Sequence, residues 1–383
     1  MLILKQQIES ILHYPFNGHP VSSFYLNVDQ ARYPKGEYLI NAKTLVKECR
    51  ERLEGEKLSR EDLRSVTEDL EKIAPAVESL KGLGYKGFAL FSSSKNGFFQ
   101  TFGLDAPVTE LLVVDRTPYT KPLLSVLRLT CRYMAVLVKK GKLRAFEVFG
   151  GSIREELDLF KASLFSTRAN AYLFTKEKKI QNRSETEHHK FLQEASAEVL
   201  DLFTRTGADF VALGGDKNVA RDFSRSMHPY LRDWYAGELE CGFEAHEKEV
   251  LGEVGRINAA KALEKDRSLT YRIREELSRG GHACRGLAGV LDSLSMGAVG
   301  ALAVKEGYSV PGYTDPRNGM LYLEPSVTPD DAKGLAPVKD VVDEAAEYAM
   351  QNGAEVRIIR TEELMEGLDG IAALLRFRVE RPE

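Results

Sequence analysis

The chain of 383 residues is poor in cysteine and tryptophan, with four and one respectively, and has no large surplus of either charge. The cysteines, at positions 49, 131, 241 and 284, form no CxxC unit and lie too far apart in the sequence for a local zinc site. We interpret them as small buried hydrophobic residues without disulfides, which is typical of a reducing compartment. No metal and no cofactor are expected.

Signals for membranes and export are also missing. No run approaches the ~18 apolar residues that span a bilayer. The start, MLILKQQIES, lacks the basic region and apolar core of a signal peptide. A cytoplasmic protein without membrane contact is therefore expected. The formal net charge of −4 argues against a uniformly basic coat for nucleic acid. It leaves room for a local basic surface, because charge acts over only about 8 Å at physiological salt.

What is present is typical of a folded protein, with 43% hydrophobic and 29% charged residues. Domains usually hold roughly 100–200 residues, so the length predicts two to four of them. Alternating helical and strand patterns predict a mixed α/β (α+β) fold class in which each domain is a sheet packed with helices. We place three domains at residues 1–107, 108–255 and 256–383.

Periodicity and turn residues predict the main elements of each domain. In the first, Asn96-Gly97 is the expected tight turn of a hairpin, and Ser59 with Asp62 forms a loose capping box. The elements expected there are a strand at 21–28, helices at 37–53 and after 59, and the hairpin at 87–104. Those expected in the second are strands at 110–115 and 209–215, a hairpin at 133–150, and helices after 151, at 191–207 and from 216. Those expected in the third are helices at 258–279, 286–299 and 338–353, and strands at 300–307, 320–324, 354–360 and 371–380.

Three motifs have both a functional and a structural interpretation. GGDKNVAR at 214–221 could cradle an anion, or it could be a tight strand-to-helix turn with Asp216 as N-cap. His188-His189 could bind a metal, but adjacent helical residues point about 100° apart, which favours a solvated helix start. His282 and Cys284 could form a nucleophilic pair, although only their proximity in sequence supports it.

Residues 168–190 have no regular periodicity and are expected to form a loop. Six basic residues against three acidic ones give this segment a local charge of +3. Such a loop could follow a phosphate backbone, or it could be an ordinary solvated surface. The candidate RNA-binding residues are Arg168, Lys176, Lys178, Lys179, Arg183 and Lys190.

The last third of the chain resembles the C-terminal domain of archaeal and eukaryotic class-1 peptide chain release factors. The residues that carry the resemblance are LDSLSMGAVGALAVKEGY (291–308), MLYLEP (320–325), NGAEVRII (352–359) and GLDGIAALLRFRV (367–379). VSSFYLNVDQ (21–30), residues 110–128 and residues 133–151 extend the resemblance upstream less strongly. The bacterial relatives of these factors are the nearest group.

The resemblance implies a three-domain translation factor that binds the ribosome and tRNA or rRNA. Its C-terminal domain would be similar to kink-turn-binding ribosomal proteins and would contact a GTPase, another protein or RNA. The family hydrolyses peptidyl-tRNA with a Gly-Gly-Gln loop, which this chain lacks. Gln181 lies in the corresponding segment without glycines and is the only catalytic candidate. Asn41-Ala42-Lys43-Thr44 has the form of the family's codon-reading Asn-Ile-Lys-Ser loop, which makes Asn41, Lys43 and Thr44 the codon-loop candidates.

Three hypotheses remain open. The first is a ribosome-associated factor in termination or ribosome rescue, whose hydrolysis of peptidyl-tRNA, if retained, would depend on Gln181. The second is a non-catalytic protein- or RNA-binding module on a release-factor scaffold, since fold does not dictate function. The third is a nuclease, for which no carboxylate or histidine cluster can be assigned.

Overall fold

The computed structural model describes residues 11, 14, 18–55, 58–80, 85–104, 106–127, 131–149, 152–160, 174–315, 317, 319–323 and 335–379. For residues 125, 127, 159, 160 and 174–185 it describes the backbone alone. The chain divides into two compact units. One comprises residues 129–262, and the other comprises residues 2–128 together with 263–383.

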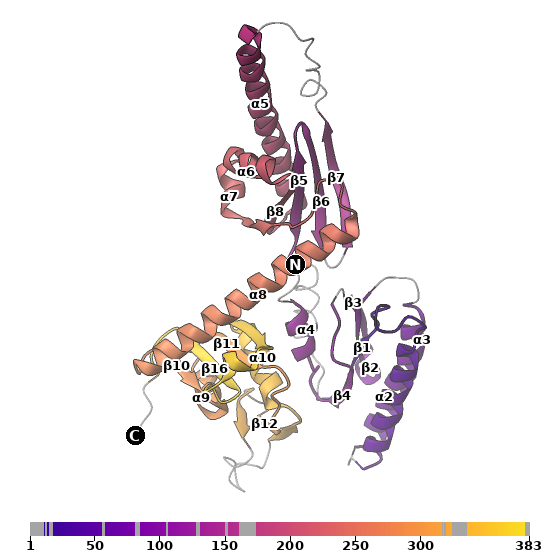
Figure 1. The fold of residues 1–383 in the computed structure, drawn as a ribbon. Helices are drawn as coiled ribbons and strands as arrows, with labels where there is room; N and C mark the ends of the chain where they lie inside the picture. The colour runs from indigo at the N-terminus through magenta and orange to yellow at the C-terminus, as the bar shows by residue number, and fades with distance from the viewer. Residues whose placement is uncertain are drawn as a thin grey trace. The chain divides into compact units, whose positions relative to one another are not determined.

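The second of these units contains an antiparallel sheet near the start of the chain, in the order β3-β2-β1-β4. Its strands are β1 (Val21–Asn27), β2 (Gly87–Ser93), β3 (Phe98–Leu104) and β4 (Leu111–Asp115). Helices α2 (Tyr38–Leu53) and α3 (Arg60–Glu78) cover one face, where Phe24, Val66 and Phe88 are buried (Figure 1). The strand expected at 110–115 therefore completes the first sheet, although it lies beyond residue 107.

Local signals in this sheet behave largely as expected. The Ser59 side chain caps α3 by accepting a hydrogen bond from the Asp62 backbone N–H at 3.1 Å. The hairpin turn differs from the expectation, because only Gly97 has a left-handed backbone, with φ +65°. Asn96 instead ends a short 3-10 helix, η1 (Ser94–Asn96).

The same unit contains the last part of the chain, built on a four-stranded sheet in the order β10-β16-β11-β15. Its strands are β10 (Ala283–Arg285), β11 (Val299–Lys305), β15 (Glu355–Ile359) and β16 (Ile371–Leu375). Helices α9 (Leu287–Ser295) and α10 (Val341–Gln351) pack their apolar faces into one core cluster, and α11 (Glu362–Met365) lies in another. A small sheet in the order β13-β12-β14 uses Gly312–Thr314 (β12), Leu321–Leu323 (β13) and Ala336–Val338 (β14).

A polar junction joins these two parts of the unit. It is formed by the segment before α4 (Lys121–Leu127) and the start of α10, and its side chains are those of Thr117, Tyr119, Thr120, Lys121, Asp340, Asp343, Glu344 and Glu347. The Lys121 ammonium lies 2.6 Å from Asp340 Oδ2, and both side chains are about 5% exposed (6% and 5%). Asp343 accepts the backbone N–H groups of Thr120 and Lys121 at 3.1 and 2.7 Å.

Burial controls the charge state of the carboxyl groups at the polar junction. It raises the pKa of Asp343 and Glu347 well above the ordinary range, although Lys121 opposes the shift at Asp343. Burial also raises the pKa of Glu344 to about 7, against a hydrogen bond from the Thr117 hydroxyl. The junction is therefore sensitive to pH near neutrality.

The other unit is built on a mixed five-stranded sheet in the order β7-β6-β5-β8-β9. Its strands are β5 (Tyr133–Lys139), β6 (Lys142–Phe149), β7 (Ser152–Phe160), β8 (Phe210–Gly215) and β9 (Tyr235–Glu238). Helices α5 (Phe174–Thr206), α6 (Lys217–Ser226) and α7 (Pro229–Asp233) share one core cluster with Met134, Val136 and Val138. Alternate residues of β5 face the opposite cluster, which includes the start of α8 (Glu247–Ser278).

The helix expected after residue 151 is wrong, because Ser152–Phe160 is a strand paired antiparallel with β6. A bulge between Ala145 and Phe146 allows the pairing to continue. Within the described residues, no helix combines the length and apolarity needed to cross a membrane.

Candidate nucleic-acid interface

The parallel strands β5 and β8 end at one edge of the sheet in the 129–262 unit. Val138 and Gly215 are register partners there, and the Asp216 N–H donates to the Val138 carbonyl at 2.8 Å. The carboxyl ends of parallel strands commonly carry the ligand-binding loops of α/β folds. This edge is therefore a candidate location for a ligand-binding site.

The GGDKNVAR segment at this edge has a structural explanation. Asp216 is the N-cap of α6, and its carboxylate accepts the N–H groups of Asn218 and Val219. Gly215 has φ +96°, and a Cβ added there would lie 2.2 Å from the Val138 carbonyl oxygen. The glycine is required by close packing against β5, which supports the capped-turn interpretation over an anion cradle.

Helix α5 overturns the expectation of a loop for residues 174–190, because the helix begins at Phe174 and continues to Thr206. The rest of that expectation, at 168–173, lies outside the described residues. Its described buried side chains begin at Phe191 and Leu192, which pack on the sheet. The first part of α5 extends beyond the strands (Figure 1). At the helical rise of about 1.5 Å per residue, residues 174–190 correspond to about 25 Å of helix. Residues 174–190 lack apolar periodicity because this part of α5 lies away from the core, where a helix needs no apolar stripe.

The structure places the candidate RNA-binding residues as follows. Lys190 is exposed, and its ammonium lies 4.0 Å from Glu194 Oε1. Four other candidates lie on the α5 backbone, namely Lys176, Lys178, Lys179 and Arg183, and Arg168 lies outside the described residues. With 3.6 residues per turn, helical positions 176, 179, 183 and 190 share one side of α5, together with position 187, a glutamate. We call the four basic positions the basic stripe.

Gln181, the catalytic candidate, also lies on the α5 backbone and not in a loop. Its main chain is therefore fixed in a helix. The backbone freedom that glycines give the family's Gly-Gly-Gln loop is missing at this position.

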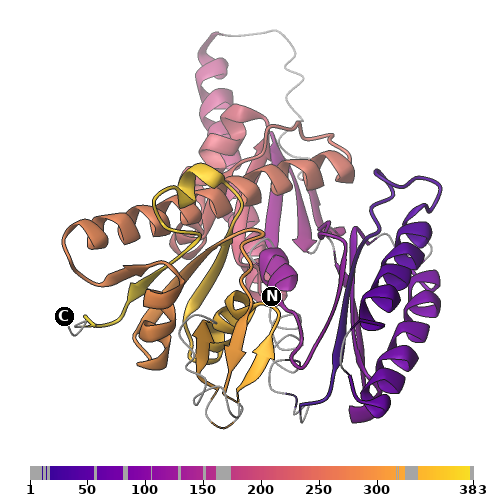
Figure 2. The same ribbon diagram turned by 90° about the horizontal axis from the view of Figure 1, so that it is seen from below.

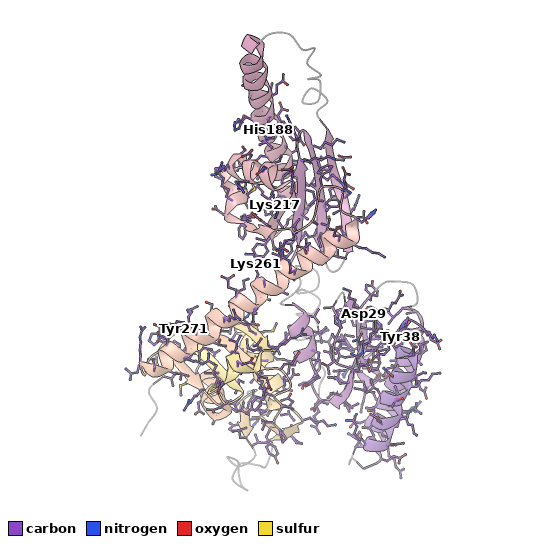
Figure 3. The ribbon with its side chains drawn as sticks, in the orientation of Figure 1. Asp29, Tyr38, His188, Lys217, Lys261 and Tyr271 are labelled. Atoms are coloured by element: carbon purple, nitrogen blue, oxygen red, sulfur yellow. The ribbon has the colours of Figure 1, made fainter. Side chains whose placement is uncertain are left out.

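The sheet edge adds basic residues that sequence patterns did not single out. Lys140 follows β5, while Lys217 and Arg221 lie on the first turns of α6, and all three are exposed. Figure 3 labels Lys217. Within the described part of the chain, none of the three forms an ion pair. The sequence places these residues just after two expected strands. That position indicates a shared surface only once β5 and β8 are known to be parallel neighbours.

His188 connects α5 to this edge. Its Nε2 lies 3.9 Å from Asp222 Oδ2 on α6. Burial lowers the pKa of His188. The Asp222 carboxylate opposes this shift, and the nearby charges of His189 and Lys140 add to it. The two histidine rings are 6.5 Å apart, and no cluster able to hold a metal occurs among the described residues.

The other candidates are not brought together as sites. Asn41, Lys43 and Thr44 lie on helix α2, where the Asn41 amide donates to Glu110 Oε2 at 3.1 Å and the Thr44 hydroxyl donates to the Ile40 carbonyl. Cys284 is buried and accepts a hydrogen bond from Ser293 at 3.4 Å, whereas His282 is exposed. The hydrogen bond that Cys284 accepts from Ser293 gives no support to a nucleophilic pair with His282.

Two family models match the chain. Residues 118–259 match the bacterial archaeo-eukaryotic release factor family 10, and residues 263–379 match eRF1 domain 3. No curated protein matches the chain.

Several solved structures are similar at low identity. An archaeal translation termination factor, aRF1, is 16% identical, with 98% of each chain covered and a TM-score of 0.26. Pelota of Archaeoglobus fulgidus is 16% identical, with 77% of this chain and 80% of that chain covered and a TM-score of 0.38. S. cerevisiae Dom34, described as a translation termination-like factor that interacts with Hbs1, is 13% identical, with 76% and 80% covered and a TM-score of 0.39. Likenesses this distant carry no argument about function.

The two family matches show that the chain is a relative of the archaeo-eukaryotic release factors, which confirms the resemblance seen in the sequence. More specifically, residues 118–259 are similar to the bacterial family 10 of this group, and residues 263–379 are similar to eRF1 domain 3.

Proposed function

We propose that this release-factor relative is a cytoplasmic, ribosome-associated translation factor that acts in termination or in the rescue of stalled ribosomes. The observation that carries the proposal is helix α5 within the family 10 segment. About 25 Å of this helix extends beyond the sheet, and the basic stripe lies along it. A continuous helix with cations on one side can follow an RNA phosphate backbone.

The three exposed cations at the sheet edge support the proposal that this end of the unit faces RNA. Lys140, Lys217 and Arg221 lie beyond the ends of β5 and β8, on the side of the sheet from which α5 projects. Such a surface positions RNA without reading its sequence, because phosphate contacts carry no base information.

Co-sedimentation with ribosomes over a range of salt concentrations tests this proposal. Four phosphate contacts on a single strand predict a slope of about −3 in log K against log salt. In K176E/K179E/R183E, binding should become weak and the slope should approach −1. Absence of the parent from every ribosomal fraction at low salt would refute the proposal.

A matched control reverses the same number of charges elsewhere in the unit. Arg205, Arg225 and Lys248 are exposed and lie outside the basic stripe, so R205E/R225E/K248E has the same net charge change. We expect this control to sediment with ribosomes nearly as well as the parent. Equal losses in both variants would show that only net charge matters.

We propose further that the factor does not hydrolyse peptidyl-tRNA by the release-factor mechanism. The chain has no Gly-Gly-Gln, and Gln181 is part of a helix. The test is release of a labelled peptide from ribosomes by the parent and by Gln181→Ala. Release by the parent that is lost in Gln181→Ala would contradict this second proposal while leaving ribosome binding intact.

Codon reading through Asn41 is not part of the proposal, since its amide is engaged by Glu110. A GTPase or another protein remains the proposed partner of the C-terminal domain, in keeping with its match to eRF1 domain 3.

A further inference from the structure

Helices α2 and α3 lie side by side on the first sheet (Figure 2). Their side chains leave an open groove of about 360 Å³ between them. The groove runs beside the first three turns of α2 and the last turns of α3. It lies on a different part of the chain from the candidate nucleic-acid interface, and nothing in the proposed function uses it.

The floor of the groove is apolar. From α2 it contains Leu39, Ala42 and Val46, and from α3 it contains Ile73, Ala74 and Val77. Two of these six residues are alanines, and Ala74 is exposed, so the floor is shallow enough for another backbone to approach. The neighbouring Ile40 is 65% exposed, which extends the apolar surface outside the groove.

The two walls carry opposite charges. Lys43, Lys47 and Arg50 form a ridge on α2 at helical spacing, and Glu71 and Glu78 form a ridge on α3. Of these five wall residues, only Lys47 forms an ion pair within the described part of the chain, with Glu51 at 3.8 Å, and both members of that pair are largely exposed. The charges of the two walls do not pair across the groove, so they are available to a ligand.

We propose that this groove is a docking site for an amphipathic helix of a partner protein, whose apolar stripe is bordered by acidic residues on one side and basic residues on the other. The apolar stripe would lie on the alanine-lined floor, as in other helix-in-groove complexes. The span from Leu39 to Arg50 is about 16 Å, which matches roughly three helical turns of the partner.

The wall charges distinguish this occupant from other ligands. RNA would meet the carboxylates of Glu71 and Glu78 at one wall, which a phosphate backbone disfavours. A helix with one kind of charge on both flanks would gain at one wall and be repelled at the other. Only a helix with split flanks complements both walls.

The probe is a labelled 15-residue synthetic peptide with a leucine stripe, glutamates on one flank and lysines on the other, titrated by fluorescence anisotropy against the full chain. Three comparison peptides keep the length: one with glutamates on both flanks, one with lysines on both, and one that scrambles the leucine stripe. We expect the split-flank peptide to bind roughly tenfold more tightly than either uniform peptide, because two or three ion pairs change sign. We expect the scrambled peptide not to bind.

The variant Ala74→Arg tests whether the peptide occupies this groove. The new side chain covers the floor and lies one turn from both Glu71 and Glu78, so the helix should be retained. Thr67→Arg, at an exposed position of the same helix outside the groove, is the matched control. Ala74→Arg should weaken binding at least tenfold, whereas Thr67→Arg should leave it unchanged.

The proposal would be overturned if no peptide bound, if split and uniform flanks bound equally, or if Ala74→Arg had no effect. Sedimentation velocity of the free chain provides a further test. A dimer that Ala74→Arg dissociates would assign the groove to a second copy of this chain and would also overturn the proposal.

Discussion

Replacing Lys121 with methionine should destabilise the unit that contains both ends of the chain. In the parent, the Lys121 ammonium lies 2.6 Å from Asp340 Oδ2 and 2.7 Å from the Tyr308 carbonyl, inside the polar junction. Methionine keeps much of the apolar stem of lysine but removes the charge. Asp340 is then left as a buried carboxylate without its cation.

The structure sets the size of this loss. Breaking a buried ion pair from one side costs about 3–5 kcal/mol. Asp340 keeps three partners, since it accepts the Val342 N–H at 3.0 Å as N-cap of α10, the Val310 N–H at 3.4 Å and the Tyr119 hydroxyl at 3.3 Å. We therefore expect about 3 kcal/mol, the lower end of that range. For a unit of this size, that lowers the unfolding midpoint by roughly 6–12 °C.

The two units can be followed separately. The only tryptophan of the chain, Trp234, lies in the 129–262 unit and should report an unchanged transition in Lys121→Met. Far-UV circular dichroism follows the other unit, and hydrogen exchange of residues 117–124 and 338–347 localises the loss. Lys305→Met, which breaks an ion pair whose members are 41% and 77% exposed, is the control and should cost less than about 1 kcal/mol.

A double variant separates charge from packing. Asp340→Asn keeps an N-cap side chain while removing the buried charge, so it should restore part of the stability lost in Lys121→Met. A free energy of unfolding for Lys121→Met within about 0.5 kcal/mol of the parent value would show that the polar junction is not a buried, charge-paired contact.

Three further predictions concern other parts of the fold. The free energy of unfolding of the unit that contains the polar junction should rise by roughly 2–3 kcal/mol as the pH falls from 8 to 5. The reason is that folding raises the pKa of Glu344 from 4.5 to about 7, so the folded state binds the proton more tightly than the unfolded state. In urea melts over a pH series, Glu344→Gln should flatten this part of the stability profile. A profile unchanged by Glu344→Gln would contradict this prediction. Gly215→Ala should cost roughly 3 kcal/mol in the other unit, seen by tryptophan fluorescence, because its Cβ meets the Val138 carbonyl oxygen at 2.2 Å; a parent-like melt would show that the turn relaxes. Asp266→Asn should cost about 3 kcal/mol in thermal melts, because Arg357, 8% exposed, loses a carboxylate at 2.7 Å; a midpoint within 1 °C of the parent would contradict this.

Local patterns in the sequence predict the elements that depend on local physics. The helix expected at 37–53 is observed at Tyr38–Leu53, and the two strands of the 133–150 hairpin are observed on either side of Gly141. Periodicity and turn residues are sufficient there, because the residues that determine each element lie within it.

Elements that depend on distant partners were not predictable in this way. Ser152–Phe160 contains arginine, glutamate and leucine, which favour helices, yet it is a strand because β6 pairs with it. The start of α5 shows the opposite case. Its lysines, glutamates and glutamine are good helix formers. Because this part of the helix does not pack on a core, its sequence has no apolar periodicity from which a helix could be predicted.

The candidate interface could be predicted only in part, because its residues are brought together by elements that are distant in the sequence. The charge of residues 168–190 can be counted in the sequence, whereas the arrangement of its cations on one side of a helix requires the helix to be known. Lys140 and Lys217 are 77 positions apart in the chain, and only the parallel pairing of β5 with β8 brings their positions to one edge. The polar junction likewise joins residues more than 200 positions apart.

We propose that α5 faces RNA on the ribosome. A cryo-EM reconstruction of the chain on stalled ribosomes tests this most directly. We predict that density for residues 174–190 contacts ribosomal RNA or tRNA along the side that contains positions 176, 179, 183 and 190. A bound chain whose α5 lies in solvent, while another surface makes all the ribosomal contacts, would contradict this role of α5.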